Sequence, residues 1–130
     1  MKTFETTIRV RYQETDGMGV VYYGNYFVWF EVARSEFLRS VGFPYRTMEG
    51  AGYRFMVVES SCKYRAPCRY DDLVTVRTRL AEVRNTSMAF EYSVAVGPDE
   101  CARGRTVHVF TDTLFKPVKI PPDLREALTS

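Results

Sequence analysis

The residues best suited to chemistry lie near the N-terminal end, in the stretch TDGMGVVYYGNY from Thr15 to Tyr26. Its one acid, Asp16, stands between small residues, and Gly17 and Gly19 leave room for a ligand to approach the backbone. An apolar segment with helical periodicity follows directly. The first turn of a helix carries unpaired N–H groups and a partial positive charge, which stabilise a nearby anion. Asp16 is therefore either a catalytic carboxylate at a helix N-terminus or, as in many Asp-Gly pairs, a turn residue.

Three further groups could have either a functional or a structural role. Residues 84–87, Arg-Asn-Thr-Ser, form a turn between two predicted strands. Their basic and hydroxyl side chains suit phosphate oxygens, although solvated hydrophilic turns are equally common. Glu31 could be a helix acid of a site, but pairing with Arg34 or Ser35 along the helix is the more ordinary arrangement. His108, the single histidine, has no acid at a readable spacing, which favours a structural role.

Composition limits the possible functions. The 130 residues predict one domain, residues 1–130, and 45% apolar with 26% charged residues is typical of a soluble globular protein. A net charge of +2 argues against a nucleic-acid partner. Three cysteines at no metal-ligand spacing indicate neither a metal site nor a disulfide framework, so we expect reduced thiols in a cytoplasmic protein. No apolar stretch is long enough to span a membrane.

The elements that must position these residues follow from periodicity. Residues 4–12 alternate as a strand, and a helix is expected from about residue 25, with the Asn25 side chain as its cap, to a stop signal at Gly42 and Pro44. Its apolar stripe comprises Tyr26, Trp29, Phe30, Ala33, Phe37 and Val41. After a short irregular or helical piece at residues 45–50, alternation returns in residues 56–65, 74–80, 88–96 and 101–115, and a short helix is expected at residues 123–128.

This order predicts an α+β fold in which one five-stranded antiparallel sheet wraps around one long helix. The four later strands are expected to form a meander. The N-terminal half of the helix is apolar nearly all round, so it must be covered. A plain open-faced α+β sandwich is the alternative architecture. The high aromatic content, 15%, indicates either a core of large rings or an interface that covers them, and a sheet with apolar edges favours pairing with another subunit.

Residues 9–34, RVRYQETDGMGVVYYGNYFVWFEVAR, closely resemble the signature of the 4-hydroxybenzoyl-CoA thioesterase family, whose members have the hot-dog fold. The order of strands and helix also matches that family over nearly the whole chain. The matching residues are Tyr12, Thr15, Asp16, Gly19, Val20, Val21, Tyr23, Asn25, Tyr26, Glu31 and Arg34. The resemblance implies a hot-dog acyl-CoA thioesterase that forms dimers and tetramers, with no metal and no bound cofactor.

The resemblance also assigns roles to residues. It implies that Asp16 is the catalytic carboxylate, as nucleophile or general base, and that the backbone N–H of Tyr23 binds the thioester carbonyl oxygen. It further implies coenzyme A phosphate contacts from Arg84, Thr86 and Ser87. Tyr22, Asn25 and Tyr26 are candidates for substrate binding, whereas Trp29 is more consistent with the core.

The sequence does not identify the acyl group of the expected substrate. Some branches of the family have His at the position of Tyr23, and the hydroxybenzoyl branch has Pro at the position of Gly24, so this chain matches neither branch fully. Two other functions are compatible with the fold. One is an acyl-CoA binding module without hydrolysis, and the other is an acyl-carrier-protein dehydratase, which would need a catalytic His with a partner acid.

Overall fold

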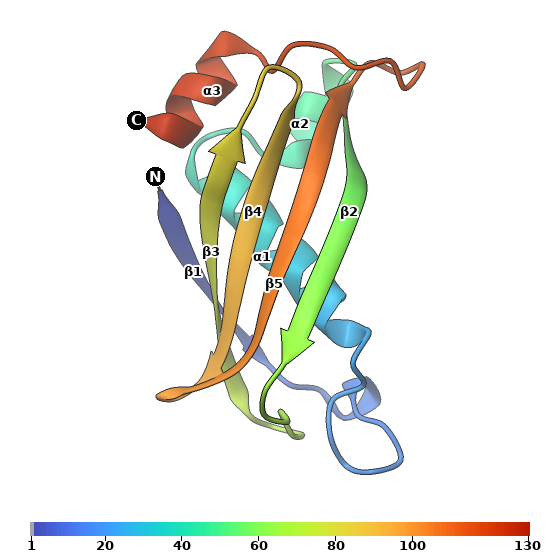
Figure 1. Ribbon diagram of the computed structural model, residues 1–130, viewed down its shortest axis with the longest axis vertical. Coiled ribbons are helices and arrows are strands. Elements are labelled where there is room, and N and C mark those ends of the chain that lie inside the picture. The colour runs from blue at the N-terminus through green and yellow to red at the C-terminus, as the bar shows by residue number, and fades with distance from the viewer. Residues whose placement is uncertain (1) are drawn as a thin grey trace.

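The computed structural model describes residues 2–130. Along the chain it contains β1 (Thr3–Arg9), a 3₁₀ turn η1 (Tyr12–Glu14), α1 (Asn25–Ser40), α2 (Tyr45–Gly50), β2 (Arg54–Tyr64), β3 (Leu73–Val83), β4 (Ser87–Val96), β5 (Asp99–Thr111) and α3 (Pro122–Thr129). The five strands form one antiparallel sheet that curves around α1, and α2 and α3 lie at one end of it (Figure 1). The predicted α+β architecture, the hot-dog fold, is confirmed.

The strand order is β1-β3-β4-β5-β2, which corrects the expected four-stranded meander. Only β3, β4 and β5 are consecutive neighbours. β1 occupies the free side of β3, from Thr3 opposite Arg79 to Arg9 opposite Leu73. Because that side is taken, β2 pairs with β5 at the opposite edge of the sheet, from Arg54 opposite Thr111 to Tyr64 opposite Ala102. One side of β2 therefore has no partner strand among residues 2–130.

Two predicted strands end earlier than their alternation indicated. β1 stops at Arg9, and Tyr12 begins the 3₁₀ turn instead of closing the strand. β5 stops at Thr111, and the next residues form a loop in which Asp112 accepts from the backbone N–H groups of Leu114 and Lys116. In both places local side-chain and turn hydrogen bonds replace the ladder.

α1 buries Tyr26, Trp29, Phe30, Ala33, Phe37 and Leu38 against the sheet. The ring of Phe30 lies so close to β5 that a Cβ at Gly104 would come within 2.3 Å of two of its atoms. Tyr92 of β4 stacks on the same ring, with centroids 4.3 Å apart. The helix ends as predicted, at Gly42 with φ +89° and a hydrogen bond from Phe43 N–H to the Leu38 carbonyl.

Within one protomer, one side of the N-terminal half of α1 is not covered. Val28 and Val32 are exposed, and so are Met56, Val57 and Val58 on the free edge strand β2. A β-bulge at Val58 breaks the alternation of β2, so the predicted covered face of this strand is not formed. Part of the apolar surface that the protomer leaves uncovered thus lies on the β2 edge and the exposed side of α1.

Among residues 2–130, no helix has both the length and the apolarity that a membrane crossing requires.

Candidate active site

Asp16 lies in a tight turn between η1 and α1. Its Oδ1 accepts hydrogen bonds from the backbone N–H of Met18 (2.8 Å) and of Val20 (3.4 Å), and its own N–H donates to the Val20 carbonyl (2.8 Å). Gly19, with φ +81°, closes the turn in a conformation that glycine adopts without strain. The side chain is half-buried, and among residues 2–130 its Oδ2 has no hydrogen-bond partner. Asp16 is thus a turn residue whose second carboxylate oxygen is free.

A second acid, Glu14, anchors this turn to the helix and was not identified from the sequence. It is 5% exposed. Its Oε2 accepts the indole N–H of Trp29 at 2.8 Å, and its Oε1 accepts the backbone N–H of Arg11 at 2.8 Å. The signal available in the sequence was Trp29, because a core tryptophan requires an acceptor for its indole N–H. The prediction that Trp29 belongs to the core is confirmed.

The start of α1 is held by the backbone of the same residue. The Glu14 carbonyl accepts from the Asn25 side-chain amide (2.8 Å) and from the Tyr22 N–H (2.9 Å). The predicted capping by the Asn25 side-chain oxygen is wrong, since Gly24 is the cap residue and the Asn25 amide donates away from the helix. Among the described residues, the backbone N–H groups of Tyr23 and Gly24 have no acceptor. These two donors lie at the positive end of the helix macrodipole.

Four tyrosines surround this helix start. Tyr22 and Tyr23 are exposed, with ring centroids 4.5 Å apart. The Tyr64 hydroxyl donates to the Tyr23 carbonyl at 2.9 Å, which ties the end of β2 to the start of α1. Burial raises the pKa of Tyr64 to about 12, so this donor keeps its proton at neutral pH.

Tyr26 differs from its neighbours because it is only 3% exposed. Its ring packs between Trp29 and Tyr64, with centroids 4.9 and 5.0 Å away. Desolvation raises its pKa above the ordinary value for a tyrosine. Tyr26 therefore belongs to the packed base of the site in this protomer, while Tyr22 and Tyr23 present their rings to solvent.

The second predicted group, Arg84 to Ser87, lies at the other end of the molecule. β3 runs from Leu73, which pairs with Arg9 beside the Asp16 turn, to Val83, which precedes Arg84. Its 11 residues span about 36 Å at ~3.3 Å each. Arg84 pairs with Glu82, and the Arg84 carbonyl accepts from Arg125 of α3. One protomer therefore does not bring Arg84, Thr86 and Ser87 to Asp16.

Three hollows on the described residues are lined by residues other than Asp16. One, of about 600 Å³, lies over the polar outer face of the sheet, between Lys63, Arg77 and Glu91 among others. Two smaller ones, of about 250 and 180 Å³, lie beside β4 and between α1, α2 and β2.

A polar chain runs through the core away from the Asp16 turn. Arg34 donates to the Tyr92 hydroxyl (3.1 Å), which bonds Thr106 (2.6 Å), and Thr106 bonds His108 Nε2 (2.8 Å). His108 is buried and stacks on Phe55, so its predicted structural role is consistent with this place, although its Nδ1 has no partner among residues 2–130. Desolvation, helped by the charge of Arg34, lowers the pKa of His108 to about 3.

The expected pairing of Glu31 with Arg34 or Ser35 is wrong. Glu31 is exposed and forms no ion pair within residues 2–130, because Arg34 turns toward Tyr92 in the core. The three cysteines are free, with Cys68 and Cys101 buried and Cys62 half-buried. Among the described residues, no group of three or more His, Cys, Asp or Glu could hold a metal ion.

Comparison with known proteins gives consistent matches over nearly the full chain. The family model described as the thioesterase-like superfamily matches residues 10–128. The acyl-CoA thioesterase YbgC of Haemophilus influenzae is 33% identical over 127 residues, which cover 95% of this chain and 93% of that protein. A hypothetical protein from Aquifex aeolicus has a crystal structure with a TM-score of 0.94 at 37% identity, covering 97% of this chain and 99% of that one. The DHNA-CoA thioesterase from Staphylococcus aureus has a TM-score of 0.93 at 32% identity, covering 98% and 89%.

Proposed function

Because the chain belongs to the thioesterase-like superfamily, we propose that it hydrolyses acyl-CoA thioesters to the free acid and coenzyme A, with Asp16 as the catalytic carboxylate. The observation that carries this proposal is the pairing of two features at one place. Asp16 has a free oxygen in the turn that leads into α1, and the N–H groups of Tyr23 and Gly24 at that helix end have no acceptor within the described residues.

The chemistry needs both features. Attack on a thioester carbonyl moves negative charge onto its oxygen, and a preoriented N–H at a helix N-terminus stabilises that charge without reorganising. The Tyr23 N–H fills this role. Asp16 Oδ2 either attacks the carbonyl carbon, forming a mixed anhydride as the C–S bond breaks and the thiolate leaves, or takes a proton from the water that attacks. The two N–H groups that bind Oδ1 fix the direction of Oδ2.

The site is completed in the proposal by a second copy of the chain. The free edge of β2 offers unpaired backbone groups beside the exposed side chains of Met56, Val57 and Val58, and Val58 is 59% exposed. Antiparallel pairing of two β2 edges about a two-fold axis covers these residues, and two α1 helices that lie side by side behind them cover Val28 and Val32.

Such a two-fold axis inverts the second copy. The end that carries residues 84–87 of one subunit then lies at the same level as the Asp16 turn of the other. The distance of about 36 Å within one protomer is thus compatible with the predicted phosphate contacts of Arg84, Thr86 and Ser87, made across the dimer. Association of two such dimers into a tetramer, and a cytoplasmic location, stay predictions of the sequence.

The decisive experiment compares the wild type with Asp16→Asn in release of coenzyme A from aliphatic and aromatic acyl-CoA thioesters. Asn keeps the shape and one acceptor oxygen but removes the charge, so turnover should fall at least ~10²-fold while KM changes little. Glu36→Gln, at a partly exposed acid on the far half of α1, is the matched control and should behave as wild type. Equal, measurable turnover in the wild type and Asp16→Asn would refute Asp16 as the catalytic carboxylate. Binding of acyl-CoA with no release of coenzyme A by either protein would instead indicate a binding module.

The panel of thioesters also addresses the acyl group. The finer assignment to the 4-hydroxybenzoyl-CoA family stays a prediction, which preferential turnover of aroyl-CoA substrates would support. Preference for aliphatic chains would place the protein in another branch of the superfamily.

A further inference from the structure

The loop between β5 and α3 presents two large apolar side chains to solvent. Leu114 is 74% exposed and Phe115 is 62% exposed. Phe115 also has φ +62°, a left-handed backbone conformation that bulky residues rarely adopt. Backbone strain at an exposed aromatic residue persists only where the surrounding structure enforces it, and such residues concentrate at ligand sites.

The conformation of this loop is fixed by Asp112. Its Oδ1 accepts from the N–H groups of Leu114 (2.8 Å) and Lys116 (3.0 Å), and its carbonyl accepts from the Phe115 N–H (3.1 Å). The Asp112 N–H in turn donates to the Lys116 carbonyl (2.9 Å). Four hydrogen bonds within five residues thus hold the apolar tip, Leu114 and Phe115, outward.

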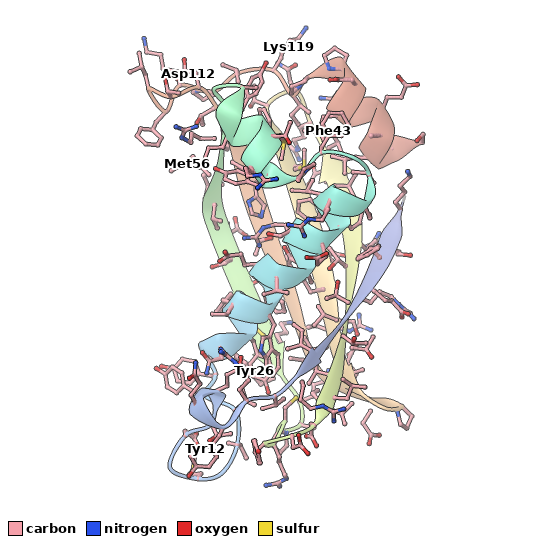
Figure 2. All side chains as sticks on the ribbon, turned by 180° about the vertical axis from the view of Figure 1, so that it is seen from behind. Tyr12, Tyr26, Phe43, Met56, Asp112 and Lys119 are labelled. Atoms are coloured by element: carbon pink, nitrogen blue, oxygen red, sulfur yellow. The ribbon has the colours of Figure 1, made fainter. Side chains whose placement is uncertain are left out.

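The loop extends beyond the free edge of the sheet. In Figure 1 the segment that follows β5 projects past β2 before it returns to α3. Figure 2 shows Asp112 above Met56, on the same edge of the molecule, with Tyr12 and Tyr26 at the opposite end. The tip therefore continues the apolar edge formed by Met56, Val57 and Val58.

The occupant that this geometry supports is the second copy that pairs along β2. When two β2 strands pair antiparallel about a centre at Val58, Arg54 of one copy lies opposite Cys62 of the other, and a centre at Glu59 places it opposite Tyr64. Arg54 pairs with Thr111, which immediately precedes Asp112. The Leu114–Phe115 tip of one copy then reaches the end of β2 in the other, where the Tyr64 hydroxyl binds the Tyr23 carbonyl.

We propose that Leu114 and Phe115 of each copy form a wall of the acyl pocket of the other copy, facing Tyr22 and Tyr23 beside Asp16. This inference rests on the proposed function, because its kinetic test measures thioester hydrolysis. The contact itself requires only that two copies pair through β2. Both surfaces are exposed in the protomer and chemically matched, since an aliphatic and aromatic tip meets a pair of exposed tyrosine rings. It also adds an apolar wall beside Asp16, which lines none of the three hollows described above.

The kinetic test is truncation of the tip. Phe115→Ala removes apolar contact with the acyl group, so KM should rise at least ~10-fold with kcat within ~3-fold of wild type. Leu73→Ala, which shortens another exposed apolar residue, at the start of β3, is the control and should leave both constants unchanged. An unchanged KM for Phe115→Ala across the thioester panel would overturn the proposal.

Complementation decides whether the wall comes from the other subunit. When Asp16→Asn and Phe115→Ala chains are mixed and allowed to exchange, mixed dimers form. If Phe115 acts on the site of the other subunit, one site of each mixed dimer combines a native Asp16 with a native Phe115. About one quarter of all sites then recover the wild-type KM, by random pairing. If Phe115 acts on the site of its own subunit, every site carries at least one substitution and no wild-type KM appears.

A cross-link tests the same contact without using activity. In a Cys62→Ser background, a Tyr22→Cys chain mixed with a Phe115→Cys chain should form a disulfide-linked dimer on mild oxidation, seen on a non-reducing gel. Leu73→Cys mixed with Phe115→Cys should not. If the cysteine pair forms the cross-link but the wild type releases no coenzyme A, the proposed function alone is refuted. If the wild type is fully active but the cysteine pair forms no cross-link, this inference alone is refuted.

Discussion

Glu14→Ala should both destabilise the fold and misplace the Asp16 turn. The substitution leaves the buried indole N–H of Trp29 and the backbone N–H of Arg11 without their carboxylate acceptor. Hydrogen bonds to a charged group contribute ~1.5 to 3 kcal/mol each, and water that enters the space recovers part of this. We therefore expect the free energy of unfolding to fall by about 3 kcal/mol.

The assay uses the one tryptophan of the chain. Urea unfolding followed by Trp29 fluorescence reports the stability directly, because Trp29 is the residue that loses its partner. The Glu14 carbonyl also holds the Asn25 side chain and the Tyr22 N–H at the start of α1. A shift of this segment moves Asp16 relative to the Tyr23 N–H, so kcat/KM for acyl-CoA should fall at least ~10-fold in the protein that remains folded.

Two variants control the interpretation. Glu14→Gln keeps the shape and one acceptor oxygen and should lose about half as much stability. Glu36→Ala removes a partly exposed acid that pairs with Arg39, and should change stability by less than ~0.5 kcal/mol. A loss below ~1 kcal/mol for Glu14→Ala, with unchanged kcat/KM, would refute the assignment of Glu14 as the anchor of the site.

Three further outcomes follow from the packing. Gly104→Ala should cost ~1 to 3 kcal/mol in urea unfolding, because the new Cβ would lie 2.3 Å from the Phe30 ring, whereas Gly50→Ala meets open space and should be nearly neutral. With its pKa lowered from 6.5 to about 3, His108 takes up its proton more readily in the unfolded chain. The free energy of unfolding should therefore fall as pH drops from 6.5 toward 3, by up to ~1.4 kcal/mol per unit, and His108→Gln should lack this part of the slope. If two copies pair through β2 as proposed, Val58→Lys should place a charge on that edge, give monomers where the wild type gives dimers in light scattering, and abolish thioesterase activity. A dimer of unchanged mass would refute pairing through β2.

The long helix and the alternation of the strands could be read from the order of residues, because both depend on local periodicity. Trp29 and Phe37 recur on one face of a helix at fixed spacing, so their burial was predictable. Gly42 ends the helix for an equally local reason, its left-handed φ. The Asp16 turn and the helix start that follows it were found in the same way.

Other features depended on partners far away in the chain. The sequence could not tell that β2 pairs with β5, because that choice depends on β1 having occupied the free side of β3. The sequence singled out Asp16 but did not identify Glu14 as an anchor, because that role depends on the packed indole of Trp29, 15 residues further along the chain.

The amino-acid sequence by itself thus determined where the long helix and the acidic turn lie and roughly where each strand runs, since neighbouring side chains and backbone preferences act over a few residues. Only the tertiary structure decided that residues 84–87 lie a full strand length from Asp16, that Arg34 faces Tyr92 instead of Glu31, and that Leu114 and Phe115 project past the free edge of β2. The reason is physical: strand pairing and burial join residues across the chain by shape and solvent exclusion, and neither leaves a periodic mark on the sequence.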